Sequence, residues 1–556
     1  DLEQSGLAIL NYKEALKINP NYGEVYTNLG DIYKKEGQFN EAVKNYRKAL
    51  KIIPDFTELH YNLGAALCAL ENVNEAIKHY ELALKIKPDY VEVFFGLGVS
   101  YSNLHQHETA IKYFKQVIKY RPNDAETHCE LGNIFFNQGL MSKAITYFKQ
   151  ALKLNPNNAE THNNLGNIFF NQNLIGKAIS CFERSLEIHP DHINVLSNLG
   201  AANEKLGKID VALNYYERAL TINSEFIEGR FNLSLLQLGN GLINEGFKNY
   251  EIRWKYKDFT SPSRRFSIPR WRGESLQGKN ILLWAEQGIG DEIHFASLIP
   301  EFKDLGCNVG IECAAKLVEL FQWSFPWAEV RETGAVNCEG SEAYGLFDYQ
   351  IPFGSIAPLL RTTLDDFRIY QKPYIPRLKE GEIKVRNKLN LKQAQLLIGL
   401  SWRSSNQSEK RSVHYLTVED LAPLKTIKNA IFLGLQYDDC IPELDRVREL
   451  GLPVRYYTNI DQKNDLSSTC ALIGACDLVI SAGTAVAQMS GALGVPTIQF
   501  HSHKGRKKPI PWFPTLRHFS LNPDAPSLLI NNIINQMPEL ITWANEVTSS
   551  KRQVFY

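Results

Sequence analysis

The sequence predicts an all-α superhelix of repeated helix pairs, followed by an α/β region built on parallel sheets. Three observations lead to this prediction: a 34-residue period fills the first half of the chain, the period ends near residue 258, and short apolar runs alternate with helical stretches after residue 278. With 556 residues, 44% of them hydrophobic and 22% charged, the chain is too long for one ordinary domain. We therefore expect several domains, the first of them made of repeats.

Three residue types recur in register through the first half of the chain. Apolar residues at helical spacing describe two amphipathic helices per unit, with a small glycine and alanine at their contact and a proline ending the second helix. Ser224 stands where a seventh proline would fall. The three ladders are Pro20, Pro54, Pro88, Pro122, Pro156 and Pro190; Gly30, Gly64, Gly98, Gly132, Gly166 and Gly200; and Ala42, Ala76, Ala110, Ala144, Ala178 and Ala212.

Stacked units bury faces that one unit alone cannot, so we expect residues 1–257 to form a right-handed superhelix with a concave groove. A half-repeat opens the chain and a degraded repeat covers residues 227–257, which implies a trimmed start or an array that continues upstream. Full repeats are expected to begin near Gly23, Thr57, Val91, Ala125, Ala159 and Ile193.

After a linker over residues 258–278, the apolar pattern changes to short continuous runs, which are typical of strands covered on both faces of a parallel sheet. We expect two α/β halves, over residues 279–388 and 389–535, and a helical tail over 536–556. The candidate strands are 281–284, 309–311, 396–400, 431–435 and 478–480.

Residues 478–500 carry no charge and are long enough to cross a bilayer. Polar residues, glycines and a proline interrupt the segment where a strand, a turn, a helix and a second strand would need them, so we predict no membrane span. This arrangement places Gly483, Thr484 and Ala485 at a helix N-terminus beyond a strand. Backbone N–H groups and the helix dipole favour an anion at such a position.

Two other segments repeat the order of strand, loop and helix. In residues 284–295, Gly288 and Gly290 allow a ligand to approach the backbone, but Ile293 takes the place of the third glycine of a dinucleotide-binding loop. In residues 398–412, a strand ends in hydroxyl and cationic side chains that could hold phosphate oxygens.

The composition limits the partners. Sixty-one basic and 61 acidic residues give a net charge of zero, which does not favour nucleic acid or an anionic membrane. The nine cysteines show no metal-binding spacing, and reduced thiols in a cytoplasm are the simplest interpretation.

The repeat unit resembles the tetratricopeptide repeat, and five strings after it look like bacterial tetratricopeptide-repeat proteins with a heptosyltransferase-like glycosyltransferase domain. The resemblance implies a GT-B fold, in which two Rossmann-like halves bind a nucleotide sugar in the cleft between them. The chain has no D-x-D pair, which agrees with chemistry that needs no metal. The strings are residues 268–273, 286–293, 399–403, 477–496 and 511–515.

The resemblance also implies roles for residues of the cleft. Asp291 aligns with the aspartate that serves as general base in heptosyltransferases, and its alternative role is that of a first-turn acid favoured by the helix dipole. Cations, hydroxyls and N–H groups would stabilise the leaving diphosphate. The donor-site candidates are Gln287, Gly288, Gly290, Trp402, Arg403, Ser404, Arg411, Gln436, Asp465, Gly483, Thr484, Ala485 and Gln488.

Two positions depart from the family pattern. Such domains commonly read D-T-x-x-x-H after the last strand, whereas Gly483 and Gln488 stand here at the acid and histidine positions. Glutamine can hydrogen-bond a phosphate or a sugar hydroxyl, but it supplies no charge and does not titrate. Either the chain uses a different sugar nucleotide, or the cleft binds one without efficient turnover. Asp465, in turn, either orients the ribose or caps the helix that follows.

An asparagine row suggests an acceptor site. An amide can pair with both the N–H and the C=O of an extended peptide, and the row resembles the asparagine ladder of O-GlcNAc transferase, although asparagine is common there in ordinary repeats. His128 and His162 also recur one repeat apart, which favours a repeated surface residue over a metal site. The row is Asn28, Asn62, Asn164, Asn198 and Asn232.

Two functions stay open. The first is a cytoplasmic, metal-independent inverting glycosyltransferase of hexosyl or heptosyl type, which uses a nucleotide sugar as substrate and no cofactor, and whose repeats hold a protein acceptor. The alternative is a repeat scaffold with a degenerate GT-B domain that binds a nucleotide but turns over weakly. Self-association through the repeats remains open in both.

Overall fold

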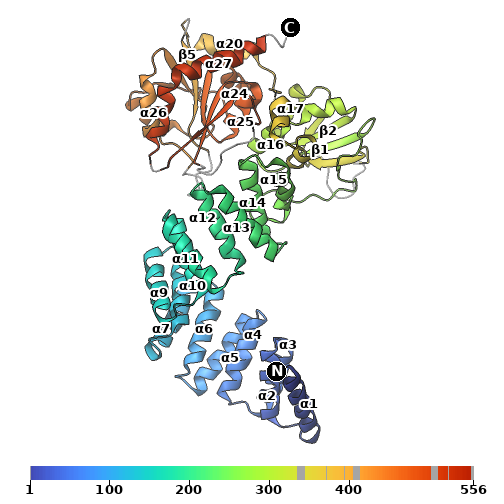
Figure 1. Cartoon of the computed structure of the whole chain (residues 1–556), viewed down its shortest axis with the longest axis vertical. Coiled ribbons are helices and arrows are strands. Elements are labelled where there is room, and N and C mark those ends of the chain that lie inside the picture. The colour runs from blue at the N-terminus through green and yellow to red at the C-terminus, as the bar shows by residue number, and fades with distance from the viewer. Residues whose placement is uncertain are drawn as a thin grey trace. The chain divides into compact units, whose positions relative to one another are not determined.

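A computed structural model describes residues 2–334, 345–370, 372–392, 395–404, 414–502, 511–523 and 525–552. The chain divides between Leu199 and Gly200 into two compact units. The first unit consists of helices only, and the second contains the end of the helical array and two parallel sheets (Figure 1).

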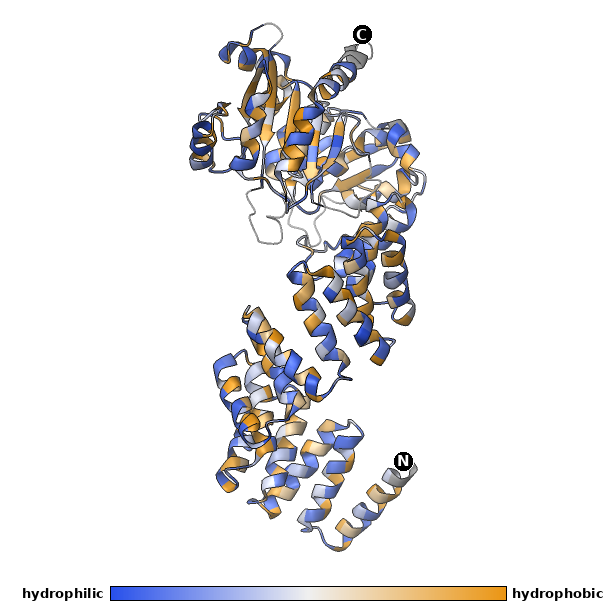
Figure 2. Cartoon of the chain, turned by 60° about the vertical axis from the view of Figure 1, so that its left-hand side comes forward, coloured by the Kyte–Doolittle hydropathy of each residue, from blue (hydrophilic) through white to orange (hydrophobic). Residues whose placement is uncertain are grey.

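Helix pairs follow one another through the array. The six expected repeat starts coincide with the first residues of α2, α4, α6, α8, α10 and α12, so this prediction is confirmed. Figure 2 shows hydrophobic and hydrophilic residues side by side along these helices, as amphipathic helices require. The helices are α1 (Leu2–Ile18), α2 (Gly23–Lys35), α3 (Phe39–Ile52), α4 (Thr57–Ala69), α5 (Val73–Ile86), α6 (Val91–Asn103), α7 (His107–Tyr120), α8 (Ala125–Asn137), α9 (Met141–Leu154), α10 (Ala159–Asn171), α11 (Ile175–Ile188) and α12 (Ile193–Lys205).

The glycine ladder is explained by close packing inside each pair. A Cβ atom added to Gly30 would lie 2.4 Å from the ring of Tyr46, too close for any side chain to fit without movement. An aromatic ring presses on the glycine in the same way in each repeat, while the alanines of the second helices are fully buried. The other pairs are Gly64 with Tyr80, Gly98 with Phe114, Gly132 with Phe148, Gly166 with Phe182 and Gly200 with Tyr216.

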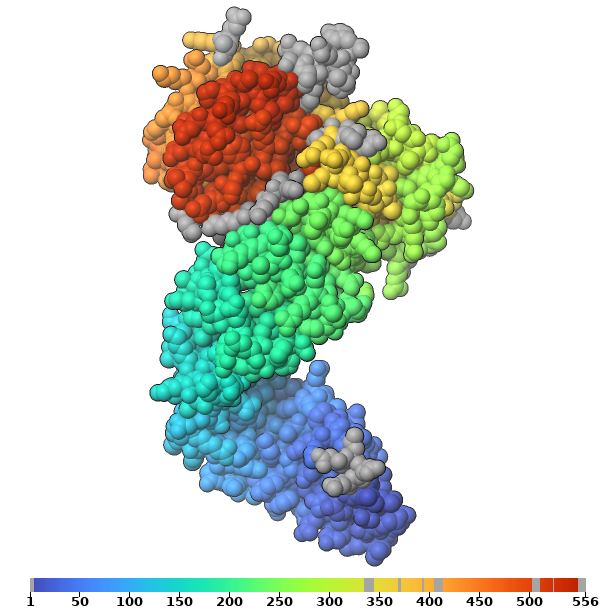
Figure 3. All heavy atoms as spheres, viewed as in Figure 1, coloured from blue at the N-terminus to red at the C-terminus, as the bar shows by residue number. Residues whose placement is uncertain are grey.

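The second unit begins with the last helices of the array, α13 (Ile209–Ile222), α14 (Ile227–Gly239), α15 (Ile243–Tyr250) and the 3₁₀ helix η1 (Glu251–Lys255). Helix α15 packs against α18 (Ala357–Leu360) of the α/β region. In Figure 3 the green atoms of this last repeat adjoin the yellow-green atoms of the first α/β half without a gap. The end of the array is therefore an integral part of the second unit.

The first sheet has four parallel strands in the order β3-β2-β1-β4. Its strands are β1 (Asn280–Trp284), β2 (Asn308–Cys313), β3 (Glu329–Glu332) and β4 (Tyr349–Pro352). Asn280 pairs with Asn308, and Ile281 pairs with Tyr349 on the other side. The strand order therefore reverses beside β1: β2 and β3 follow on one side of it, and β4 lies on the other. Its helices are α16 (Ile289–Ala296), α17 (Val318–Ser324), α18 and α19 (Leu364–Tyr370), with the 3₁₀ helices η2 (Ile299–Leu305), η3 (Ala315–Leu317) and η5 (Phe353–Ser355).

The second sheet has six parallel strands in the order β10-β9-β8-β5-β6-β7, and here the reversal lies between β5 and β8. Its strands are β5 (Leu396–Ser401), β6 (Ala430–Gly434), β7 (Val454–Arg455), β8 (Leu478–Ala482), β9 (Thr497–His501) and β10 (Leu516–Ser520). Its helices are α20 (Lys379–Lys388), α22 (Val418–Leu421), α23 (Ile441–Glu449), α24 (Leu466–Ala475), α25 (Ala485–Leu493), α26 (Ser527–Asn535) and α27 (Met537–Arg552), with η6 (Ala422–Thr426).

The expected strands are confirmed to within a few residues, and the uncharged segment 478–500 forms β8, a turn, α25 and the start of β9. Within the described ranges, no helix is both long and apolar enough to span a membrane. Parallel α/β sheets bind ligands where the strand order reverses, at the carboxyl ends of the strands. Both predicted loops, after β1 and after β8, lie at such points.

Candidate functional site

One large cavity lies at the carboxyl edges of the two sheets, with a volume of about 880 Å³. Loops after β1, β5, β6 and β8 line it together with residues of β9, and so do Phe231 of α14 and residues 256 and 258–260, which follow η1. The cavity wall therefore combines both α/β halves with the end of the repeat array. It is large enough for a nucleotide-sized ligand.

The loop after β1 brings its predicted residues to the cavity. Gln287, Gly288, Gly290 and Asp291 all line it, and Gly288 precedes the first residue of α16. An added Cβ at Gly290 would lie 3.6 Å from the Cα of Ala485, at the start of α25. The N-termini of two helices, one from each half, therefore meet at the cavity.

Two adjacent carboxyl groups in α16 have different surroundings. Asp291 is exposed and lines the cavity. Glu292 is buried and its Oε2 accepts a hydrogen bond from the Ala314 backbone N–H at 2.9 Å. Burial raises the pKa of Glu292 to about 7. Asp291 is thus the carboxylate of this helix that lines the cavity, and Glu292 joins α16 to the end of β2.

The second half contributes the first turns of α25. Gly483, Thr484, Ala485 and Gln488 line the cavity, as predicted, and Ser404 lies there with its Oγ 3.1 Å from the hydroxyl of Tyr437. None of the α25 side chains in this group is charged. Binding of an anion here would depend on backbone N–H groups, hydroxyls and the Gln488 amide.

Gln488 has a partner that the sequence did not reveal. Its Oε1 lies 2.8 Å from Nδ1 of His294, a residue of α16. The His294 ring packs on Trp512 with 4.1 Å between ring centroids, and burial lowers its pKa to about 4. A neutral imidazole donates Nδ1–H to the amide oxygen, which leaves the amide N–H groups of Gln488 for the cavity. His294 of the first half thus orients the Gln488 amide of the second.

Four donor-site predictions are corrected by the structure, because these side chains do not line the described cavity. Arg403 is 7% exposed, and its guanidinium pairs with Asp438 and with Glu443, at 2.6 Å from Nη2 to Oε2. Acidic residues after β6 therefore neutralise the expected phosphate ligand.

The other three have structural roles. Gln436 is fully buried and donates to the Arg403 carbonyl at 2.9 Å. Trp402 is 1% exposed in the core of the second half. Asp465 caps α24 by accepting from the Ser468 N–H at 2.9 Å, which was the alternative role considered for it. Arg411 lies outside the described residues.

Several lining residues were not predicted. Lys316 and Lys463 add positive charge, and Phe231 and Tyr256 form an aromatic wall, with parallel rings whose centroids are 4.3 Å apart. These residues come from positions with no motif, so only the three-dimensional fold brings them together. The remaining unpredicted polar lining residues are Asp258, Thr260, His414, Tyr415, Tyr437, Gln462, Thr469, Gln499 and His501.

The asparagine row forms a ladder that joins neighbouring repeats. Asn62 donates to Asp31 at 3.1 Å, Asn164 to Asn133 at 2.9 Å and Asn198 to Asn167 at 3.0 Å. In each case the acceptor lies 31 residues earlier, in the preceding repeat.

The two ends of the row differ. Asn28 donates to Tyr12 at 3.4 Å, and Ala201 stands where Asn232 would find its acceptor. The row therefore holds repeats in register, and peptide binding by it remains a prediction.

The repeated histidines bind backbone rather than metal. His60, His128 and His162 each place Nε2 within 3.1 Å of the carbonyl of a ladder proline six residues earlier. His128 is 8% exposed, so the expectation of a surface residue is wrong for it. Among the described residues, no group of histidine, cysteine, aspartate or glutamate side chains could hold a metal.

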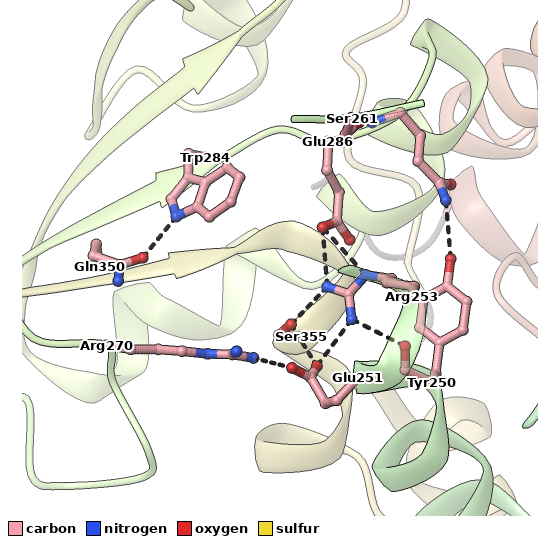
Figure 4. Close-up of polar contacts among 10 residues, drawn as sticks. Tyr250, Glu251, Arg253, Ser261, Arg270, Trp284, Glu286, Gln350 and Ser355 are labelled. Carbon is pink, nitrogen blue, oxygen red and sulfur yellow. Dashed lines mark hydrogen bonds and ion pairs between the residues drawn. The ribbon is translucent and has the colours of Figure 1, made fainter. Parts of the chain in front are cut away.

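A buried polar network, shown in Figure 4, joins the last repeat to the loop after β1. Arg253 of η1 is fully buried and pairs with Glu286 at 2.9 Å and with Ser355 at 2.7 Å. Glu251 accepts from Arg253, Ser355 and Arg270. Two cations and two carboxylates thus balance one another between the array and the first sheet.

The fold and the cavity define a chain that joins a helical repeat array to a separate parallel α/β region. Tetratricopeptide-repeat models match residues 11–44, 30–71, 55–123, 125–158 and 157–225, so the array consists of tetratricopeptide repeats.

Protein FlbA of Caulobacter vibrioides is 30% identical over 311 residues, which cover 52% of this chain and 51% of FlbA. The chain thus spans about half the length of this curated relative. Two solved repeat structures are also similar. The pilF protein of Pseudomonas aeruginosa is 18% identical, covers 38% of this chain and 97% of its own, and has a TM-score of 0.35. A tetratricopeptide repeat protein of Parabacteroides merdae is 17% identical, and the match covers 43% of this chain and 94% of that protein, with a TM-score of 0.37.

Proposed function

We propose that the chain is a metal-independent, inverting glycosyltransferase of the GT-B type that transfers a sugar from a nucleotide sugar to a protein acceptor held by the repeats. One observation carries the proposal: a single cavity is lined by a carboxylate, Asp291, from one α/β half and by an uncharged helix N-terminus, that of α25, from the other. This division suits a reaction in which a proton leaves on one side and an anion forms on the other.

The proposed reaction is a single displacement. Asp291 accepts the proton of an acceptor hydroxyl, the hydroxyl oxygen forms a bond to the anomeric carbon, and the bond from that carbon to the diphosphate oxygen breaks. The diphosphate leaves with the bonding electron pair. Donors that are in place before the reaction stabilise the charge that develops on it. Thr484, the backbone N–H groups that open α25 and the Gln488 amide are the donors we assign.

The repeats suit a protein or peptide acceptor, because such arrays present extended surfaces for protein–protein interaction. Phe231 and Tyr256 bring the end of the array to the cavity itself. An acceptor bound by the repeats would therefore meet Asp291 beside this aromatic wall.

The second candidate is a repeat scaffold whose cleft binds a nucleotide without efficient turnover. Two features favour this candidate. Acidic side chains neutralise Arg403, and Gly483 and Gln488 carry no charge. These features weaken the stabilisation of a leaving diphosphate, but they do not prevent nucleotide binding.

Thermal unfolding with a panel of UDP-, GDP-, ADP-, CDP- and CMP-linked sugars tests donor binding first. A ligand at 100 times its dissociation constant stabilises the native protein by about 2.7 kcal/mol, which raises the melting temperature. A shift with one base selects the donor for turnover assays. The absence of a shift with all of them would reject a donor site in this cavity.

With that donor, Asp291→Asn should lower the rate of nucleoside diphosphate release by about 10²- to 10⁴-fold, because the general base is lost. Donor affinity should stay unchanged, since the base acts on the acceptor. Asp304→Asn is the matched control, as Asp304 is an exposed carboxylate of the same half. Equal release by wild type and Asp291→Asn would remove Asp291 from catalysis, and donor binding without release by either protein would favour the scaffold.

A further inference from the structure

We propose that Tyr250, the last residue of the final repeat helix α15, is a positioning residue for the cleft, which it serves by holding the backbone of Gln287 in its cavity-facing conformation. The inference rests on the proposed function, because the loop that Gln287 belongs to carries Asp291. It goes further in making the repeat array a structural part of the site.

Gln287 has an unusual backbone conformation. Its φ is +68°, in the left-handed region that glycine adopts readily and other residues adopt at a cost. The next residue, Gly288, precedes α16, and its carbonyl accepts a hydrogen bond from the Asp291 N–H at 2.9 Å. The conformation of Gln287 therefore sets where α16 begins and where Asp291 lies.

Two contacts hold Gln287 in this conformation (Figure 4). Its backbone N–H donates to the Ser261 hydroxyl, and its side-chain Nε2 donates to the Tyr250 hydroxyl at 3.1 Å. Neither partner belongs to the sheet that carries the loop. Ser261 lies in the segment after the array, and Tyr250 belongs to the array itself.

Tyr250 is itself held firmly. It is 7% exposed, the Arg253 guanidinium lies 4.8 Å from its ring centroid, and burial raises the pKa of its hydroxyl to about 12. The hydroxyl is therefore neutral and fixed in place. Arg253 also pairs with Glu286, the residue before Gln287. The last repeat thus holds both residues of the chain that lead into the glycine loop.

The test compares Tyr250→Phe, Gln287→Gly and the double variant with the wild-type chain. Tyr250→Phe removes one hydroxyl and keeps the ring, so the loop should lose its support while the repeat stays packed. Hydrogen–deuterium exchange of residues 285–292 should become faster, and affinity for UDP, GDP, ADP or CDP, whichever the wild type binds, should fall about two- to tenfold.

Glycine at position 287 should remove the dependence of the loop conformation, measured by hydrogen–deuterium exchange of residues 285–292, on the Tyr250 hydroxyl. It adopts the left-handed conformation without help, so Tyr250→Phe should have no effect in the Gln287→Gly background. A merely structural role for Tyr250 would lower the melting temperature equally in both backgrounds and leave that dependence unchanged. Tyr46→Phe is the matched control, because it removes a tyrosine hydroxyl bonded to Asp31 at 2.6 Å within the first unit.

The outcomes separate the two proposals. Unchanged exchange of residues 285–292 in Tyr250→Phe, or an equal loss in both backgrounds, overturns the positioning role even if nucleotides bind. If the wild type binds neither any of these four nucleotides nor CMP, the glycosyltransferase proposal fails, and the exchange data alone decide whether Tyr250 holds the loop.

Discussion

Asp291 and Glu292 show how one residue step along a helix changes the chemistry of a carboxyl group. Asp291 faces the cavity, whereas Glu292 faces the protein interior and has a pKa near neutrality. Two residues after Glu292, the partly buried His294 stays uncharged down to a pKa of about 4. The pKa of Glu292 is therefore raised and that of His294 is lowered, so both shifts favour the uncharged form of the side chain.

These two groups give opposite dependences of stability on pH. The pKa of Glu292 rises from 4.5 to about 7 on folding, so the unfolded chain loses this proton first and stability falls as the pH rises between those values. The pKa of His294 falls from 6.5 to about 4, so the unfolded chain binds this proton first and stability falls as the pH drops through that window.

Replacing Glu292 by glutamine should separate the two effects. The amide oxygen can still accept from Ala314, but the ionisation is gone, so the variant should exceed the wild type in stability by about 3 kcal/mol near pH 8 and match it near pH 4. Between these limits the difference in stability from the wild type should grow as the pH rises, because the Glu292 ionisation is the one that the substitution removes. Urea unfolding across this range measures it, with Glu329→Gln as an exposed control. A constant difference at all pH values would contradict the pKa shift of Glu292.

The elements of the array are joined by side chains that recur at the same position of several repeats. Glycine receives an aromatic ring within a helix pair, asparagine bonds to the preceding repeat, and histidine bonds to the proline carbonyl between repeats. Arg230 uses the same position as the histidines and donates to the carbonyl of Ser224, which replaces the proline. The repeats are thus specified by contacts within a unit and with the adjacent unit.

Substitution of the ladder glycine should therefore be costly. In Gly132→Ala the new Cβ would lie 2.6 Å from the Phe148 ring, and forcing the ring aside should destabilise the protein by about 1–3 kcal/mol. Gly176→Ala is the matched control, because Gly176 is also helical but a Cβ there meets nothing within 4 Å. The control should be neutral or stabilising by up to about 1 kcal/mol. Chemical unfolding of both variants provides the comparison, and equal losses would refute the packing argument.

Most of the elements could be predicted from the sequence, because periodicity and apolar runs report burial directly. The repeat starts and the strands follow from these patterns, and so do the loops after β1 and β8 that line the cavity. The charge pairing could not be predicted. Arg403 was taken as a phosphate ligand, but Asp438 and Glu443, more than 30 residues away, neutralise it. Phe231 reaches the cavity, and His294 reaches Gln488, only through tertiary packing, for which a single sequence has no local signal.

On the scale of the whole molecule, the boundary between compact units falls at Leu199 and Gly200, inside α12, rather than at the change of sequence pattern near residue 258. The reason lies in the polar network of η1. Arg253 and Glu286 are fully buried partners from the array and from the loop after β1. Such a pair binds the last repeats to the sheet region, because either charge alone would be buried without compensation.

Arg253→Met should consequently cost about 3–5 kcal/mol, since it leaves Glu286 charged and unpaired in the interior. Arg253→Met combined with Glu286→Gln should recover part of that loss, because both charges are then absent. Differential scanning calorimetry of the two single variants, Arg253→Met and Glu286→Gln, the double variant and the wild type tests this coupling. If the double variant lost more stability than the two single variants together, the coupling would be contradicted.

The same network limits how the chain could change in length during evolution. Repeats before residue 200 contact their neighbours through recurring bonds, so a gene duplication or deletion of whole 34-residue units there preserves every interface. The helices from α14 to η1 have no such freedom, because their side chains complete the sheet region and its cavity. Gain or loss of repeats should therefore be tolerated on the N-terminal side, while the last repeats are inherited together with the α/β region as one segment.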